Sequence, residues 1–226
     1  MYEDLELRNL NDICKRDRFG LYKQWIYDNC NYMRMCNYMQ KINYAIQDLN
    51  QIIEDLEKFD RRNIVYIITL VGWITDAIRD IKSIIRKDVI ARFCFDKQEL
   101  LKKHHDYYVA IRSFIVAHPL ETTRHDKYGF NGDFICVDIR NFSTLFPFAK
   151  NQYEMYNVDV NGLNLELRGD EDFYLYCYSE QIDGMEFFQK IGCRYCDIYN
   201  VARIYIDKLY ALDSFLVKNI KRKDYE

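Results

Sequence analysis

An arginine and a histidine lie six positions apart near the middle of the chain, in the segment from Arg112 to Pro119. Together these two side chains have the chemistry to cleave RNA without a metal. An imidazole can move protons at the 2′-hydroxyl or the leaving oxygen, and a guanidinium can stabilise the charge of a phosphorane. We therefore expect His118 to be the acid-base residue and Arg112 the phosphate-stabilising one, with the Ser113 hydroxyl orienting them and no cofactor required.

The motif resembles that of the HEPN family, whose members are helical bundles bearing an arginine, four to six arbitrary residues and then a histidine. The gap here is five residues. The run Ala117-His118-Pro119, at a helix end before the last long helix, is similar to members tied to toxin-antitoxin and abortive-infection systems. The resemblance implies a metal-independent endoribonuclease acting on RNA in phage defence, with an antitoxin or another protein as a possible partner.

The residue after the arginine is commonly Asn, Asp or His in active HEPN ribonucleases, whereas it is Ser113 here. The family also includes non-catalytic members that serve as binding or assembly modules. A protein-interaction module is therefore the alternative function. In that case Arg112 is a surface cation, and His118 is a helix-terminal histidine favoured by the last carbonyls of its helix.

Geometry sets a condition on the catalytic hypothesis. Residues six apart on an α-helix lie about 120° apart around its axis, so Arg112 and His118 do not share a face. Either the helix unwinds before Pro119, which disfavours helical geometry at the preceding residue, or a second subunit completes the site across a two-fold axis, as the resemblance implies. We favour a homodimer in which both pairs line one cleft.

Four more residues are candidates for binding the substrate. His105 lies seven positions before Arg112 on nearly the same helical stripe, and Tyr108 can stack on a base. Their alternatives are a solvent-facing histidine and a core tyrosine. Lys102 and Lys103 belong to a basic rim that can hold phosphates, or that forms a solvated face balanced by nearby aspartates. The other members of the rim are Arg79, Lys82, Arg86, Lys87, Arg92 and Lys97.

Apolar residues at alternating steps of four and three predict four amphipathic helices, over 35–56, 67–85, 101–118 and 198–216. The first two are separated by the polar stretch 60–63, so we expect them to form an antiparallel hairpin. Four such helices indicate a mainly α, HEPN-like four-helix bundle.

Between the third and fourth helices the apolar period changes to that of strands, at 134–139, 157–160, 163–167 and 173–178. Asn161-Gly162 is a strong hairpin signal, because both residues accept positive φ. We therefore expect a small antiparallel β sheet inserted at 121–180, between the first part of the bundle at 1–120 and the last helix at 181–226.

Composition excludes several classes. The 226 residues are 49% apolar and 30% charged, as in a folded globular protein. The sequence has no apolar stretch that reaches the roughly 18 to 20 residues of a membrane span, and its start has no apolar signal core. We expect a cytoplasmic protein without membrane contact. The net charge of −3 requires any basic site to be local.

Two other motifs favour structural roles. Cys193 and Cys196 have the CxxC spacing of a zinc knuckle or redox pair, but no second pair of ligands has suitable spacing. A buried or half-buried structural pair is the better interpretation. His104-His105-Asp106 and His125-Asp126 resemble metal-binding dyads, yet four histidines leave little for a full ligand set. We expect no metal site.

Overall fold

The computed structural model describes residues 2–14, 20–21, 32–58, 60–118, 120, 123–128, 130, 135–139, 153–157, 171–182 and 185–219. This part of the chain is mainly helical and includes a small sheet. Two compact units can be distinguished. The first comprises residues 1–58, 69–101 and 199–226, and the second comprises 59–68 and 102–198.

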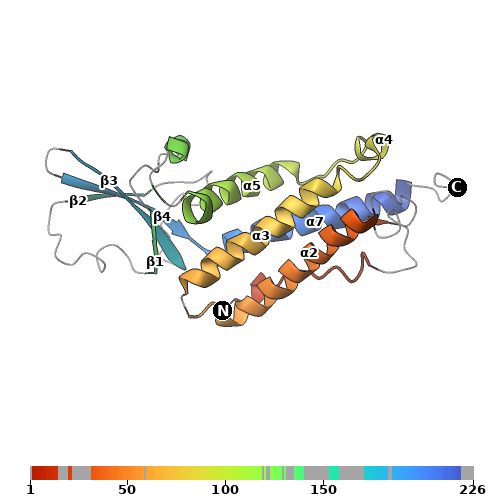
Figure 1. Ribbon diagram of the computed structural model, residues 1–226, viewed down its shortest axis with the longest axis horizontal. Coiled ribbons are helices and arrows are strands. Elements are labelled where there is room, and N and C mark those ends of the chain that lie inside the picture. Colours follow the sequence, from red (N-terminus) through yellow and green to blue (C-terminus); the bar gives the residue numbers. More distant parts are fainter. Residues whose placement is uncertain are drawn as a thin grey trace. The chain divides into compact units, whose positions relative to one another are not determined.

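Helices α2 (Tyr32–Ile52), α3 (Arg61–Ile81, from Thr69 on) and α7 (Tyr195–Asn219, from Tyr199 on) dominate the first unit (Figure 1). The start of α2 packs against the end of α3. The Tyr38 hydroxyl donates to Asp80 at 3.3 Å, and Lys41 lies 4.7 Å from the ring centroid of Trp73. These contacts confirm the predicted antiparallel pairing of the two helices.

The third helix of this unit, α7, is tied to α2, and α2 in turn is tied to the N-terminal segment. The buried Tyr199 hydroxyl donates to the Leu49 carbonyl at 2.7 Å, and the Asn50 side chain exchanges two hydrogen bonds with the backbone of Leu7. Short helices η1 (Glu3–Leu5), η2 (Ile53–Asp55) and α4 (Lys87–Ile90) complete the unit. The predicted seam residues of this unit are buried except for Ile53, which is half-buried. The buried ones include Met35, Ile42, Leu49, Ile74, Ile78, Leu209 and Leu216.

The second unit contains α5 (Gln98–Arg112, from Lys102 on) and strands β1 (Ile135–Asp138), β2 (Tyr153–Asn157), β3 (Phe173–Ile182) and β4 (Met185–Cys193). The strand order is β1-β3-β4-β2. Neighbours β1, β3 and β4 pair antiparallel, with a register irregularity between Ser179 and Ile182. Strand β2, by contrast, runs parallel to β4. Arg61, at the start of α3, donates to the Val137 carbonyl of β1 at 2.7 Å.

The sheet differs from the sequence prediction in several places. Strand β4 was not predicted, and it takes the sheet to Cys193, beyond the expected range of 121–180. The prediction of a purely antiparallel sheet was wrong for β2, which also begins earlier than the expected run at 157–160. The predicted strand at 163–167 and the Asn161-Gly162 turn lie outside the described residues. The predicted strands at 134–139 and 173–178 correspond to β1 and β3.

Candidate anion-binding pocket

The third predicted helix ends in an unusual turn. Regular α5 stops at Arg112, and Ser113–Ala117 (η3) form a π-helical turn. The His118 backbone N–H donates at 2.9 Å to the Ser113 carbonyl, five residues earlier, and His118 leaves helical geometry with φ −144° and ψ 64°. The following Pro119 disfavours helical geometry at His118, which explains why the helix ends there. Single π turns of this kind occur frequently at functional sites.

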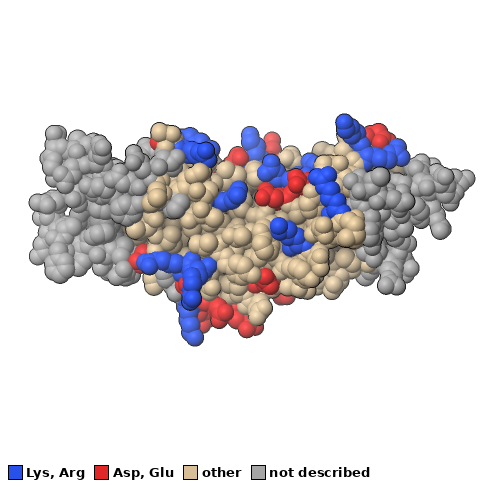
Figure 2. Space-filling model, in the orientation of Figure 1, with Lys and Arg blue, Asp and Glu red and all other residues tan. Residues whose placement is uncertain are grey.

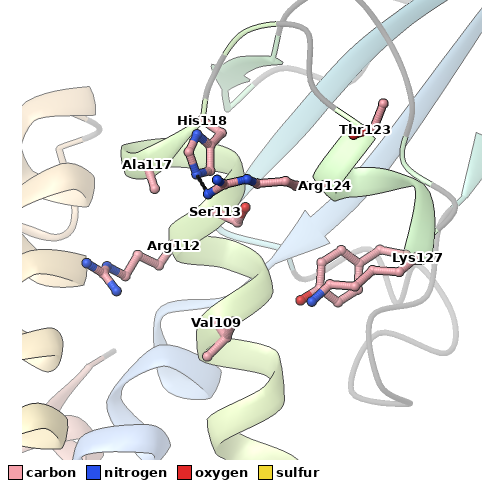
Figure 3. A pocket seen from close by; sticks show the side chains of 9 residues that line it. Val109, Arg112, Ser113, Ala117, His118, Thr123, Arg124 and Lys127 are labelled. Carbon is pink, nitrogen blue, oxygen red and sulfur yellow. Dashed lines mark hydrogen bonds between the residues drawn. The ribbon is translucent and has the colours of Figure 1, made fainter.

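A pocket of about 440 Å³ opens beside this turn, within the range of small-molecule sites. Among the described residues that line it, the charged ones are all basic, namely Arg112, Arg124 and Lys127, with His118 half-buried among them. A concave surface to which the described residues contribute three cations and no carboxylate is suited to an anion. The pocket is lined by Val109, Arg112, Ser113, Ala117, His118, Thr123, Arg124, Lys127 and Tyr128 (Figure 3).

His118 contacts Arg124 directly. Arg124 Nη1 lies 2.5 Å from His118 Nε2, and Figure 3 shows the guanidinium turned toward the imidazole. A guanidinium can only donate, so His118 Nε2 is the acceptor in this contact. The sequence analysis missed Arg124. In the sequence, Arg124 is recognisable only as a basic residue a few positions after a proline. Its proximity to His118 becomes evident only in the folded structure.

Arg112 is not paired with His118 in this chain. Its side chain points away from the imidazole on the other side of the helix end (Figure 3). The predicted unwinding before Pro119 does occur, as the π turn, but it does not swing His118 onto the Arg112 face. Both residues nevertheless line the same pocket. Ser113 also lines it, between the two on the chain.

A short helix, η4 (Thr123–Tyr128), presents Arg124 and Lys127, and His125 anchors it. The buried His125 ring packs edge-on against Phe114 and hydrogen-bonds to the Ser113 backbone. Phe114 also packs edge-on against Tyr128 and Phe130, with ring centroids 5.4 and 5.0 Å apart. Burial lowers the pKa of His125, and the Ser113 hydrogen bond offsets part of that effect. His125 is therefore neutral and holds η4 on the π turn.

The predicted substrate-binding residues lie outside the pocket. Tyr108 is buried, and its hydroxyl donates to the Ile68 carbonyl at 3.2 Å, so it belongs to the core. His105 is half-buried on α5, and Lys102 and Lys103 are exposed on the first turns of that helix. None of these four residues lines the pocket.

The basic rim is interspersed with acids. Arg86 forms an ion pair with Asp88 at 2.7 Å, and Arg79 lies 4.0 Å from Asp76. Figure 2 shows acidic side chains among the basic ones on the face in view. These contacts favour the solvated-face interpretation of the rim over a continuous phosphate-binding surface.

The cysteine and histidine motifs have structural environments. Cys193 is buried and Cys196 half-buried, as predicted for a structural pair, and burial raises the pKa of both thiols. A thiol with a raised pKa is a poor nucleophile and a poor metal ligand. His104 is buried on α5, and burial lowers its pKa. The described residues contain no group of three or more metal-ligating side chains.

No protein-family model matches the chain, and no curated protein or solved structure matches it either. Among the described helices, none is long and apolar enough to cross a membrane.

Proposed function

We propose that the protein is a metal-independent endoribonuclease of the HEPN type, acting in the cytoplasm in a toxin-antitoxin or phage-defence system. The observation that supports this proposal is the position of His118, in a pocket to which the described part of the chain contributes three basic and no acidic side chains. An RNA backbone is a polyanion, and its cleavage needs a proton-transferring group close to cations.

The chemistry requires only side chains that line the pocket. The 2′-oxygen attacks the adjacent phosphorus, and the bond to the 5′-oxygen breaks. His118 takes the 2′-proton or gives a proton to the leaving oxygen, and Arg112 stabilises the charge on the phosphorane. The products are a 2′,3′-cyclic phosphate and a 5′-hydroxyl. Ser113 donates a hydrogen bond that orients the phosphate. We propose that this reaction proceeds without a metal ion.

The proposal includes a homodimer of HEPN-like four-helix bundles. Because Arg112 points away from His118 of its own chain, a two-fold axis that brings the His118 of a second copy to Arg112 would give each site a complete pair. The protein also needs an antitoxin or another partner to restrain it in the cell, since a nuclease of this class is toxic when free.

A non-catalytic interaction module is the second candidate. Two observations favour it: Arg112 and His118 point apart, and Arg124 occupies His118 Nε2. A module of this kind would use the pocket to bind an anionic group of a partner, such as a phosphate or carboxylate, without cleaving it. The two candidates differ in one result, namely the formation of cut RNA ends.

The test compares wild type, His118→Ala and His105→Ala, incubated with total RNA and transfer RNA in EDTA, with the cut ends mapped. His105→Ala is the matched control, because that histidine lies on the same stretch of chain but outside the pocket. We expect 2′,3′-cyclic phosphate ends with wild type and the control, and none with His118→Ala. Growth arrest on expression should follow the same pattern.

Three results would contradict the proposal. Loss of cleavage in EDTA would move the mechanism to a metal site. Cleavage or toxicity that persists in His118→Ala would remove His118 from the mechanism. Absence of cleavage by wild type, with retained binding of a phosphorylated ligand in the pocket, would establish the interaction module instead.

A further inference from the structure

We propose that Arg124 is the arginine that receives the phosphate, and that it masks His118 until a phosphate arrives. In the unliganded protein the Arg124 guanidinium would hold the His118 Nε2 lone pair, and a bound phosphate would draw the guanidinium away and expose that nitrogen. The meaning of this exchange for catalysis rests on the proposed function, but the exchange itself is a binding event that can be observed without RNA cleavage.

Arg124 and His118 are in contact in the unliganded protein. His118 Nε2 accepts a hydrogen bond from Arg124 Nη1, so its lone pair is already in use. A base needs that lone pair to take a proton from a hydroxyl. The arrangement therefore describes a resting site rather than a catalytic one, and productive binding has to break or rearrange this contact.

The His118 imidazole and a phosphate differ as hydrogen-bond acceptors for Arg124. A guanidinium has five N–H donors in a planar fork that matches two oxygens of a phosphate. Hydrogen bonds between two ionised groups are about twice as strong as bonds between neutral groups, and the imidazole offers only a neutral acceptor. A phosphate in the pocket would thus compete successfully with His118 for Arg124.

The transfer of the Arg124 guanidinium from His118 to a phosphate needs little movement. Arg124 is exposed, and its backbone lies in η4, which His125 anchors on the Ser113 carbonyl. A change of its side-chain torsions redirects the guanidinium while the η4 backbone stays in place. The other two cations have different positions: Lys127 lies 4.6 Å from the Tyr128 ring centroid, and Arg112 points to the far side of the helix end. Arg124 is the cation whose contact with His118 the structure records.

The experiment records the imidazole nitrogens of His118 by long-range ¹H–¹⁵N correlation NMR, with inorganic phosphate as the probe. Wild type is compared with Arg124→Ala, Arg124→Lys and Lys127→Ala, and His118→Ala assigns the signals. Lys127→Ala is the matched control, because it removes one cation from the same helix and the same pocket without touching His118. Phosphate is titrated at fixed pH and ionic strength.

We expect phosphate to move the Nε2 signal of wild type, and Arg124→Ala to show a moved Nε2 signal before any phosphate is added. Its phosphate affinity should fall about tenfold, which corresponds to about 1.4 kcal/mol. Lys127→Ala should keep the wild-type signal in the absence of phosphate. Arg124→Lys should restore part of the affinity, because it keeps the charge but not the fork.

An Nε2 signal that is the same in wild type and Arg124→Ala would overturn the inference, and so would a phosphate affinity unchanged by the loss of Arg124. The proposed function fails separately. If RNA is not cleaved while the Nε2 signal responds as described, Arg124 still masks His118 in a binding site. If Arg124→Ala has an unchanged spectrum and cleaves RNA at the wild-type rate, the nuclease stands without this role for Arg124.

Discussion

The rings of His125 and Phe114 pack edge to face, with their centroids 4.8 Å apart and their planes inclined by 78°. Phe114 belongs to the π turn that ends the α5 segment, and His125 belongs to the short helix that carries Arg124. This contact, together with the hydrogen bond from His125 to the Ser113 backbone, fixes the two sides of the pocket to each other. The positions of His118 and Arg124 therefore depend on a buried histidine that is not itself in the pocket.

Replacing His125 tests this dependence. His125→Leu removes the hydrogen bond to Ser113, whereas His125→Asn keeps a donor at a similar distance from the backbone. We expect the leucine variant to speed hydrogen exchange of the His118 amide by about tenfold and to weaken phosphate binding, since the Ser113 carbonyl is shared with that amide. The asparagine variant should lie closer to wild type. Equal exchange rates in both variants would show that the Phe114 contact alone is sufficient.

Acidification should destabilise the protein through its buried histidines. Burial lowers the pKa values of His104 and His125 below the ordinary value near 6.5. Between that value and the lowered ones, the unfolded chain binds more protons than the folded chain, so the free energy of unfolding falls as the pH falls below about 6.5. Denaturant melts at pH 7 and pH 5.5 measure the fall. The fall in the free energy of unfolding should be smaller in His125→Asn than in wild type. An equal fall in both would contradict the contribution assigned to His125.

Lys208 on α7 is a buried cation beside other cations. It is 6% exposed, and burial together with Lys82 and Arg79 lowers its pKa to about 8, against an ordinary 10.5; its Nζ lies 5.9 Å from the Tyr205 ring centroid. Lys208→Met keeps the apolar stem and removes the charge. We expect it to raise the free energy of unfolding at pH 7 by about 1 kcal/mol, as when buried charges are replaced by apolar groups.

The pH dependence supplies the check on this prediction. The folded protein loses the Lys208 proton near pH 8 and the unfolded chain near 10.5, so the cost of the charge is full below pH 8 and disappears as the pH rises toward 10.5. The gain from Lys208→Met should therefore shrink between pH 8 and 10. If Lys208→Met were less stable than wild type at pH 7, favourable contacts of the Lys208 ammonium would outweigh the cost of burying its charge.

Gly20 leaves room for a buried carboxylate. Asp213 Oδ1 accepts a hydrogen bond from the Leu21 amide at 2.9 Å, and a Cβ at position 20 would overlap this oxygen and contact Val217. Gly20→Ala should destabilise the protein by about 1 to 3 kcal/mol, the usual cost of overpacking. Chemical denaturation measures it. Stability equal to wild type would mean that the carboxylate can move without losing its contact with Leu21.

Helices were the predictable part of the fold. The seam from Met35 to Leu49 alternates apolar steps of four and three, and the period of a helix is set locally, so the sequence is sufficient to place α2. Strand β4 was missed because its pairing with β3 is a contact between segments, and its residues Glu186, Gln189 and Lys190 break the apolar alternation of a typical strand. The parallel pairing of β2 with β4 is likewise invisible in either segment alone.

The pocket was predictable only in part. The sequence placed His118 at a helix end beside a proline, which is a local property. It did not identify Arg124 as the neighbour of His118, because that contact is tertiary and depends on His125 being buried. Tyr108 shows the opposite error: its position on the helix allowed a stacking role, while the Ile68 carbonyl that its hydroxyl binds lies 40 residues away along the chain.

The buried thiol of Cys193 lies at the last position of β4, and Cys136 lies exposed on β1 of the same sheet. A reagent that alkylates thiols thus meets one of them in the native state and the other only after the strand has separated from its neighbours. The labelling rate of Cys193 measures how often the sheet opens, and Cys136 supplies the reference for an accessible thiol. The chain thereby contains, in its own two cysteines, both the reporter of local unfolding and its reference, without an engineered residue.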